Sequence, residues 1–285
     1  MDGAWLRLRC TRWVKWCEKH ELPLRLDLFG LTRLGKATFD SLKRISIPQT
    51  LGFTPKIDAK TGNPAANAVS KHEYAWLTLR RLLSGRVMRA FLHKDGRSYN
   101  PITNVSKEIR RQMQIDGETL QEADLACSFW YLLATELPNG PEKERLVEMI
   151  HAGCFYEAVA DAAGQDYADR SSLKIECQRQ LLFAHDWRES SRPLWKGLRK
   201  LFPGLCRLIE KHRSQLGISE FAKHLMRLEG RLMDTVHYRL IELGIHAIRL
   251  HDGMLVGASK VTTAASVIEE AGERLFGSKP ATKTK

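Results

Sequence analysis

Residues 245–256 read IHAIRLHDGMLV, and this stretch decides the fold that the sequence predicts. Two apolar runs flank His251-Asp252-Gly253, which is the composition of a strand, a tight turn and a second strand. Asp252 is therefore expected at the tip of a hairpin. Taken alone, the pattern is also ordinary turn chemistry, because aspartate and glycine are common in turns.

A second acid is expected at the end of another apolar strand. Asp116-Gly117 separates two short apolar runs and predicts a hairpin, and Asp124 closes the run that follows it. After Leu125 the apolar residues repeat with helical spacing. Asp124 therefore lies where a strand gives way to a helix. Two strand-end carboxylates brought together can hold divalent cations about 3.5–4 Å apart, an arrangement that serves phosphoryl transfer.

The rest of the chain predicts an α+β fold. A small antiparallel sheet is expected from residues 87–126 and 245–258, with a large, mostly helical insertion between them. The insertion ends in a long helix over 219–243, and a final helix is expected over 262–276. The predicted regions are a basic helical N-terminal layer at 1–70, the sheet region at 71–127 and 242–276, the helical region at 128–241, and a disordered tail at 277–285.

The charge balance indicates a polyanionic partner. Lys and Arg number 45 against 33 Asp and Glu, which gives a formal net charge of +12. No apolar run is long enough to span a bilayer, and the first residues lack the pattern of a secretory signal. The six cysteines show neither CxxC pairs nor zinc-ligand spacing, which predicts reduced thiols. A cytoplasmic protein without a membrane partner is expected.

Two basic clusters are candidates for phosphate binding. Arg170 and Lys174 are four residues apart, so a helix would place both cations on one face, suited to a triphosphate. A solvated helix face is the alternative. Lys107, Arg110 and Arg111 form the second cluster, for which a phosphate clamp and a solvated face are both open.

The order of these motifs resembles that of the family A DNA polymerases and the single-subunit phage RNA polymerases. It is still more similar to small phage or mobile-element proteins with an abbreviated polymerase palm. The resemblance covers about residues 85–276. The motifs that carry it are Gly96-Arg97-Ser98-Tyr99, Arg110 before Ile115-Asp116-Gly117-Glu118, Asp124-Leu125-Ala126-Cys127-Ser128, Arg170 with Lys174, and His251-Asp252-Gly253.

The resemblance implies a palm-type sheet, a fingers-like helical region and a set of site residues. Asp124 and Asp252 would bind two Mg²⁺ ions, with Mn²⁺ as the alternative metal, and His251 would steady the primer end or its neighbouring acid. Arg170 and Lys174 would contact the phosphates of a nucleoside triphosphate. The residues implied to contact template or primer are Arg97, Tyr99, Arg110 and Glu229.

The sequence also departs from the polymerase pattern. Phe129 is the fifth residue after Asp124, where DNA-making members carry a glutamate that screens the sugar, so sugar selection is open. Leu182-Phe183-Ala184 replaces the Tyr-Gly pair on which the incoming base packs, and Phe183 is the candidate stacking ring. The helical region is also shorter than full-sized fingers.

Two functions follow from the resemblance. The first is a template-dependent nucleotidyltransferase, a reduced DNA or RNA polymerase or primase that serves the replication of a phage or mobile element. The second is a non-catalytic, nucleic-acid-binding replication initiator or accessory protein that retains a polymerase-like palm. The short helical region and the missing Tyr-Gly pair favour the second, whereas a nuclease would need more clustered acids.

Overall fold

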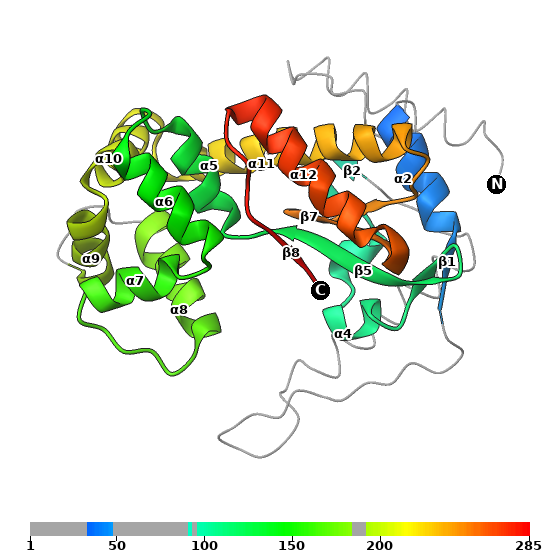
Figure 1. Ribbon diagram of the computed structural model, residues 1–285, viewed down its shortest axis with the longest axis horizontal. Helices are drawn as coiled ribbons and strands as arrows, with labels where there is room; N and C mark the ends of the chain where they lie inside the picture. The colour runs from blue at the N-terminus through cyan, green and yellow to red at the C-terminus, as the bar shows by residue number, and fades with distance from the viewer. Residues whose placement is uncertain (1–32, 48–90, 93–95, 184–191) are drawn as a thin grey trace. The chain divides into compact units, whose positions relative to one another are not determined.

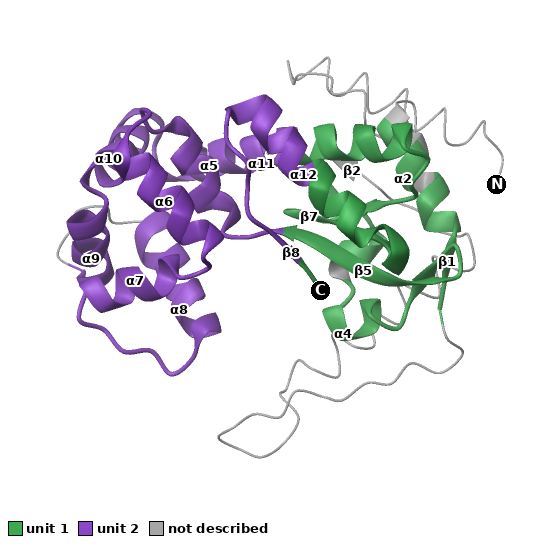
Figure 2. Cartoon of the chain, viewed as in Figure 1, with its two compact units in different colours: residues 1–124, 233–267, 284–285 green, residues 125–232, 268–283 purple. Residues whose placement is uncertain are grey.

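The computed structural model describes residues 33–47, 91–92, 96–183 and 192–285 (Figure 1). Of the basic helical layer expected at 1–70, only residues 33–47 are among the described residues, and residues 71–90 and 93–95 of the expected sheet region lie outside them. The chain divides into two compact units (Figure 2). Unit 1 comprises Met1–Asp124, Met233–Val267 and Thr284–Lys285, and unit 2 comprises Leu125–Leu232 and Ile268–Lys283.

The main sheet has the strand order β1-β4-β5-β7-β6, and β8 also pairs with β5. The pairings along that path are antiparallel, as the sequence predicts, and β5 and β7 form its longest ladder. A separate antiparallel pair joins β2 and β3. The strands are β1 Ile45–Ser46, β2 Phe91–Leu92, β3 Ser98–Tyr99, β4 Gln114–Ile115, β5 Glu118–Leu125, β6 Ile248–Arg249, β7 Gly253–Gly257 and β8 Thr282–Thr284.

Both hairpins expected from Asp-Gly pairs are present. Asp116 and Gly117 have φ angles of 52° and 82°, the left-handed backbone that a two-residue turn between β4 and β5 requires. The second hairpin joins β6 to β7, where the Leu250 N–H donates to the Gly253 carbonyl over 2.8 Å. Local turn chemistry therefore sets the register of the strands that carry the acids.

One buried apolar cluster of unit 1 packs against these strands. The helix α2 (Arg33–Lys43), the 3₁₀ turn η1 (Pro101–Asn104) and the short helix α4 (Lys107–Arg110) contribute apolar side chains to it. Asn100 caps η1, and Ser106 caps α4 by accepting a hydrogen bond from the Ile109 N–H. The buried cluster comprises Leu42, Ile45, Ile102, Val105, Ile109, Met113, Ile115, Leu120, Ile248, Leu250 and Leu255.

Unit 2 is helical, which agrees with the helical spacing after Leu125. Its core contains an aromatic chain in which the Trp130 and Phe155 rings lie 4.7 Å apart and the Phe155 and Phe202 rings 6.1 Å apart. The helices are α5 Ser128–Glu136, α6 Pro141–His151, α7 Phe155–Ala162, α8 Arg170–Cys177, the π-helical η2 Gln178–Leu182, α9 Pro193–Leu201 and α10 Pro203–Leu216, while α11 Ile218–Glu242 and α12 Val261–Phe276 contribute to both units.

The tail differs from its prediction. Residues 277–285 were expected to be disordered, but β8 pairs with β5, and Lys285 and Glu122 exchange two backbone hydrogen bonds of 3.0 and 2.9 Å. A short polar strand shows no apolar alternation, so only its partner strand reveals it. In the part of the chain that the structure describes, every helix is too short or too polar to cross a bilayer.

Candidate active site

The register of β5 and β7 brings the two expected acids together within unit 1. Asp124 pairs with Gly253, the first residue of β7, and Asp252 precedes Gly253 directly. Asp252 is close enough to raise the pKa of the Asp124 carboxyl. Two acids that lie far apart in chain order are therefore neighbours in the fold.

Gly253 permits this close approach of the strands. A Cβ atom at this position would lie 2.6 Å from the Ala123 carbonyl oxygen and 3.1 Å from the Asp124 Cα. Both atoms belong to backbone and cannot rotate away. The glycine of the hairpin is thus required by the packing of β7 against β5.

Asp124 is buried and incompletely paired. Its side chain is 10% exposed, and one carboxylate oxygen, Oδ2, accepts a hydrogen bond from the Lys285 ammonium. The other oxygen, Oδ1, is buried and has no hydrogen-bond partner among the described residues. Burial first and the charge of Asp252 second raise the pKa of Asp124 to about 6.

This environment fits a divalent metal ion. Hard cations such as Mg²⁺ bind carboxylate oxygens, and an additional positive charge would stabilise two neighbouring carboxylates. The buried Oδ1 of Asp124 needs a partner of that kind. Asp124 and Asp252 are therefore the residues that would hold Mg²⁺ or Mn²⁺.

A second acid and three cations surround Asp124. Glu122 is two residues earlier on β5; its carboxylate lies 3.9 Å from the Lys285 ammonium and 3.3 Å from the Arg110 guanidinium. Arg110 also donates to the Val105 carbonyl over 3.1 Å. Burial and the charge of Lys285 lower the pKa of Lys107. In this arrangement Arg110, expected to contact nucleic acid, holds Glu122 and the end of η1.

The turn at residues 96–99 packs against the His-Asp hairpin in unit 1. The Tyr99 and His251 rings lie 4.9 Å apart, edge to face. The Asn100 side-chain amide donates to the Arg249 carbonyl over 2.7 Å, and the Arg249 guanidinium donates to the Gly96 carbonyl over 3.0 Å. Arg97, in this turn, is half-buried. The turn at 96–99 and the His251-Asp252-Gly253 hairpin, which the sequence suggested as separate motifs, therefore contact each other.

Arg249 is the central cation of this contact. Its side chain is 3% exposed, and its guanidinium forms an ion pair with Asp234 of α11. The ion pair and the Gly96 hydrogen bond link α11, β6 and the turn before β3. A buried guanidinium is tolerated when an opposite charge lies beside it, and these two contacts hold the turn and α11 against β6, so Arg249 is a positioning residue.

The expected nucleotide-binding residues lie in unit 2. Arg170 and Lys174 are four residues apart on α8, so the helix that was predicted for them is present. Arg170 forms an ion pair with Glu157 and donates to the Gly153 carbonyl over 2.6 Å. Lys174 is exposed. Arg170 therefore anchors the start of α8, whereas Lys174 reaches solvent.

The two remaining candidates in unit 2 are partly or fully enclosed. The Phe183 ring is half-buried and lies 5.7 Å from the Phe129 ring, edge to face. Glu229 of α11 is 1% exposed and accepts a 2.7 Å hydrogen bond from the Ser128 hydroxyl. Ser128 ends the motif that begins with Asp124, so Glu229 contacts the start of α5.

Several residues of the site were not singled out from the sequence. Glu122, Arg249, Asn100 and Lys285 complete the contacts of the expected residues. A signal existed for Arg249, because a cation inside an apolar strand needs a buried acid. Lys285 had none, since its role depends on the pairing of β8.

The comparisons with known proteins find little beyond a weak structural likeness. No protein-family model and no curated protein matches the chain. Among solved structures, it is similar to the POL domain of Pol1 from M. smegmatis, in complex with a DNA primer-template and dNTP, with a TM-score of 0.48 and 11% identity. The match covers 88% of this chain and 63% of that chain, so this chain spans less than two thirds of that domain.

Proposed function

We propose that the protein is a template-dependent nucleotidyltransferase, a reduced polymerase or primase of the phage or mobile-element type. The observation that carries the proposal is the proximity of Asp124, on β5, to Asp252, in the turn before the neighbouring strand β7, together with a buried Asp124 oxygen that has no hydrogen-bond partner among the described residues. The motif order of the sequence and its net charge of +12 support a nucleic-acid substrate. Residues 71–127 with 242–276 would be the palm, and residues 128–241 the fingers.

The roles of the residues follow from their chemistry. Bound Mg²⁺ would supply charge neutralisation for phosphoryl transfer from a nucleoside triphosphate to a primer hydroxyl. Asp124 and Asp252 would hold the metal in their ionised forms. Lys285 neutralises Asp124 in the structure described here and would release it on metal binding.

Residues around the acids would bind the primer and template. His251, whose ring contacts Tyr99, would steady the primer end beside Asp252. Arg97, in the turn that Arg249 holds, would contact the nucleic-acid backbone. Arg170 and Lys174 would contact the triphosphate, and Phe183 would stack on the incoming base, roles that rest on the motif order.

A second candidate function is favoured by one contact. Lys285 already supplies a positive charge to Asp124, which is what a protein that binds nucleic acid without metal would need. In that case the protein would be a non-catalytic initiator or accessory protein. A nucleoside triphosphate would then give no metal-dependent increase in melting temperature, whereas an enzyme would show one.

The decisive experiment is a nucleotide-incorporation assay. Primer extension and de novo synthesis would be measured with deoxyribonucleotides and ribonucleotides, for the wild type and for Asp124→Asn and Asp252→Asn. We expect each variant to lose about 10³-fold or more in incorporation, because metal-based charge stabilisation is worth several kcal/mol. Binding to a labelled primer-template should change little.

A matched control distinguishes the loss of any one negative charge from the loss of an acid at the proposed site. Asp161 is an exposed residue of α7, and Asp161→Asn removes one charge from unit 2. This variant should retain the wild-type incorporation rate. Full incorporation by both Asp124→Asn and Asp252→Asn would overturn the proposal, and a wild type that binds primer-template but incorporates nothing under any metal would support the accessory protein.

A further inference from the structure

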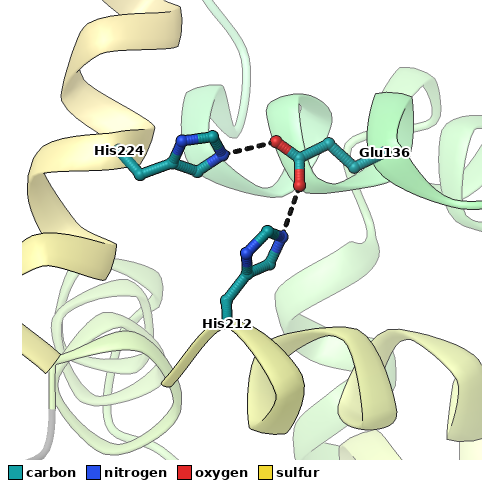
Figure 3. A group of neighbouring side chains, drawn as sticks. All are labelled: Glu136, His212 and His224. Atoms are coloured by element: carbon teal, nitrogen blue, oxygen red, sulfur yellow. Dashed lines mark hydrogen bonds and ion pairs between the residues drawn. The ribbon is translucent and has the colours of Figure 1, made fainter. Parts of the chain in front are cut away.

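A cluster of three potential metal ligands lies in unit 2, among residues to which the proposed function gives no role. It comprises Glu136, His212 and His224 (Figure 3). Glu136 is the last residue of α5, His212 belongs to α10 and His224 to α11. Three different helices therefore each direct one side chain to a common point.

The geometry of the cluster is compact. His212 Nε2 lies 2.5 Å from Glu136 Oε2, and His224 Nε2 lies 2.6 Å from Glu136 Oε1. All three ligand atoms lie within 4.8 Å of one another. The two imidazole nitrogens approach the same carboxylate from different helices, as Figure 3 shows.

The packing of the His212 ring and the partial exposure of the three side chains both suit an ion site. The His212 ring is stacked on the buried Phe221 ring, with centroids 5.7 Å apart and planes 19° apart, which restricts its rotation. The side chains of His212, His224 and Glu136 are 17%, 28% and 22% exposed. The cluster is thus enclosed enough to weaken hydration and open enough for an ion to enter.

We propose that Glu136, His212 and His224 form a binding site for a borderline transition-metal ion, with Zn²⁺ as the favoured ion. Two imidazoles and one carboxylate are a known three-ligand set for zinc, and solvent would occupy the fourth position. Zinc ligands at about 2.0–2.1 Å from the ion lie about 3.3 Å from one another in tetrahedral geometry. Glu136 would bind the ion through one oxygen. The imidazole that contacts this oxygen, at 2.5 or 2.6 Å, would move away from it by less than about 1 Å, and the second imidazole would turn from the other oxygen toward the ion.

The site would act as a clamp between α5, α10 and α11. The α10–α11 connection turns at Gly217, and the ion would add a second connection between these helices and the end of α5. Because the ligands already meet through hydrogen bonds, the ion would stabilise an assembled site and would not need to fold it. This site is independent of Asp124 and Asp252, so its test does not depend on incorporation.

The test is zinc binding by the full chain, purified without a polyhistidine tag. Metal content would be measured by mass spectrometry, affinity by competition with a chromophoric chelator, and geometry from the visible absorption of the Co²⁺-substituted protein. We expect one Zn²⁺ per chain, a tetrahedral Co²⁺ spectrum and a melting temperature that falls when a chelator is added. His212→Gln and His224→Gln should each weaken binding by at least tenfold, in line with the loss of one ligand.

Three further variants keep the result interpretable. His246→Gln removes an imidazole that lies 2.7 Å from the Asp116 carboxylate in unit 1, and it should bind Zn²⁺ as the wild type does. His224→Cys replaces one zinc ligand by another and should restore binding if His224→Gln fails to fold. Cys154→Ser excludes the exposed thiol as the zinc ligand. A wild type that takes up no stoichiometric Zn²⁺, or glutamine variants that bind as tightly as the wild type, would overturn the proposal.

Discussion

The carboxylates of Asp124 in unit 1 and Glu136 in unit 2 differ in how completely they are paired. Glu136 has an imidazole nitrogen on each oxygen, whereas Asp124 has a lysine on one oxygen and no partner on the other among the described residues. Glu136 is also more exposed, at 22% against 10%. The difference indicates that the Asp124 carboxylate carries a higher desolvation cost than the Glu136 carboxylate, because one of its buried oxygens has no hydrogen-bond partner among the described residues.

Arg249 sharpens the comparison most, because it is a buried charge that is paired with the Asp234 carboxylate and the Gly96 carbonyl. Arg249→Met would leave Asp234 and the Gly96 carbonyl without their donor. We expect a loss of about 3–5 kcal/mol in the free energy of unfolding, measured by urea denaturation. Arg239→Met is the control, since Arg239 forms an exposed pair with Glu242 and should cost about 1 kcal/mol at most. Equal losses would contradict the positioning role of Arg249.

Asp124→Asn should break the usual rule that removal of a buried contact destabilises. With a chelator present, we expect this variant to gain about 1–3 kcal/mol, because burial and Asp252 penalise the ionised carboxyl. Glu136→Gln should instead lose about 1 kcal/mol, since both imidazoles would lose their charged partner. Thermal melting of both variants would measure these changes. If Asp124→Asn and Glu136→Gln both raised, or both lowered, the melting temperature, the predicted contrast between the two carboxylates would be wrong.

His237 predicts an acid sensitivity that belongs to unit 1. Burial first and Arg249 second lower the pKa of His237 to about 3, so the folded chain keeps this ring neutral when the unfolded chain protonates it. Stability from this residue is complete above pH ~6.5 and is lost as the pH falls toward 3, with a loss of about 2 kcal/mol at pH 5.

His237→Gln should remove that part of the pH dependence. Denaturant unfolding at pH 7.5 and at pH 5 would measure the difference between variant and wild type. Tyr238→Phe, at the neighbouring exposed position, should keep the wild-type pH profile. An unchanged loss of stability at pH 5 in His237→Gln would show that other groups cause the acid sensitivity.

Lys285→Ala carries the smallest expected effect. Under the proposed function, Lys285 would compete with Mg²⁺ for Asp124, so its removal should tighten Mg²⁺ binding about fivefold, equivalent to about 1 kcal/mol. Calorimetric titration would measure the change. Lys279→Ala, which removes an exposed ion pair with Glu273, should leave the affinity unchanged. Weaker binding in Lys285→Ala would mean that the lysine assists the metal.

Local chemistry made the strands and helices predictable from the sequence. Asp116-Gly117 and Asp252-Gly253 set two hairpins, and the apolar spacing after Leu125 predicted the helices of unit 2. The mixed helical and antiparallel composition followed from these patterns. The strand β8 was missed because three polar residues show no periodicity, and β1 was missed because two residues are too few to show any.

Only those site residues could be predicted whose own type and position in the sequence indicated a function. The acids stood at strand ends, so their pairing followed from two hairpins. The contacts of Arg110, Arg170 and Glu229 were not predictable, because their partners Glu122, Glu157 and Ser128 are chosen by packing. The cluster of Glu136, His212 and His224 comes from three helices, and no spacing in the sequence brings its members together.

The short distance between Gly253 and the Ala123 carbonyl has an evolutionary consequence. Gly253 is required by the close approach of the backbone, whereas Asp252 would be required for its negative charge. In a lineage that lost catalysis, selection on the acid would relax while selection on the glycine would persist. Under the proposed function, a homologue with glycine at this position and a neutral residue before it would therefore have lost the proposed metal-binding acid and kept the fold.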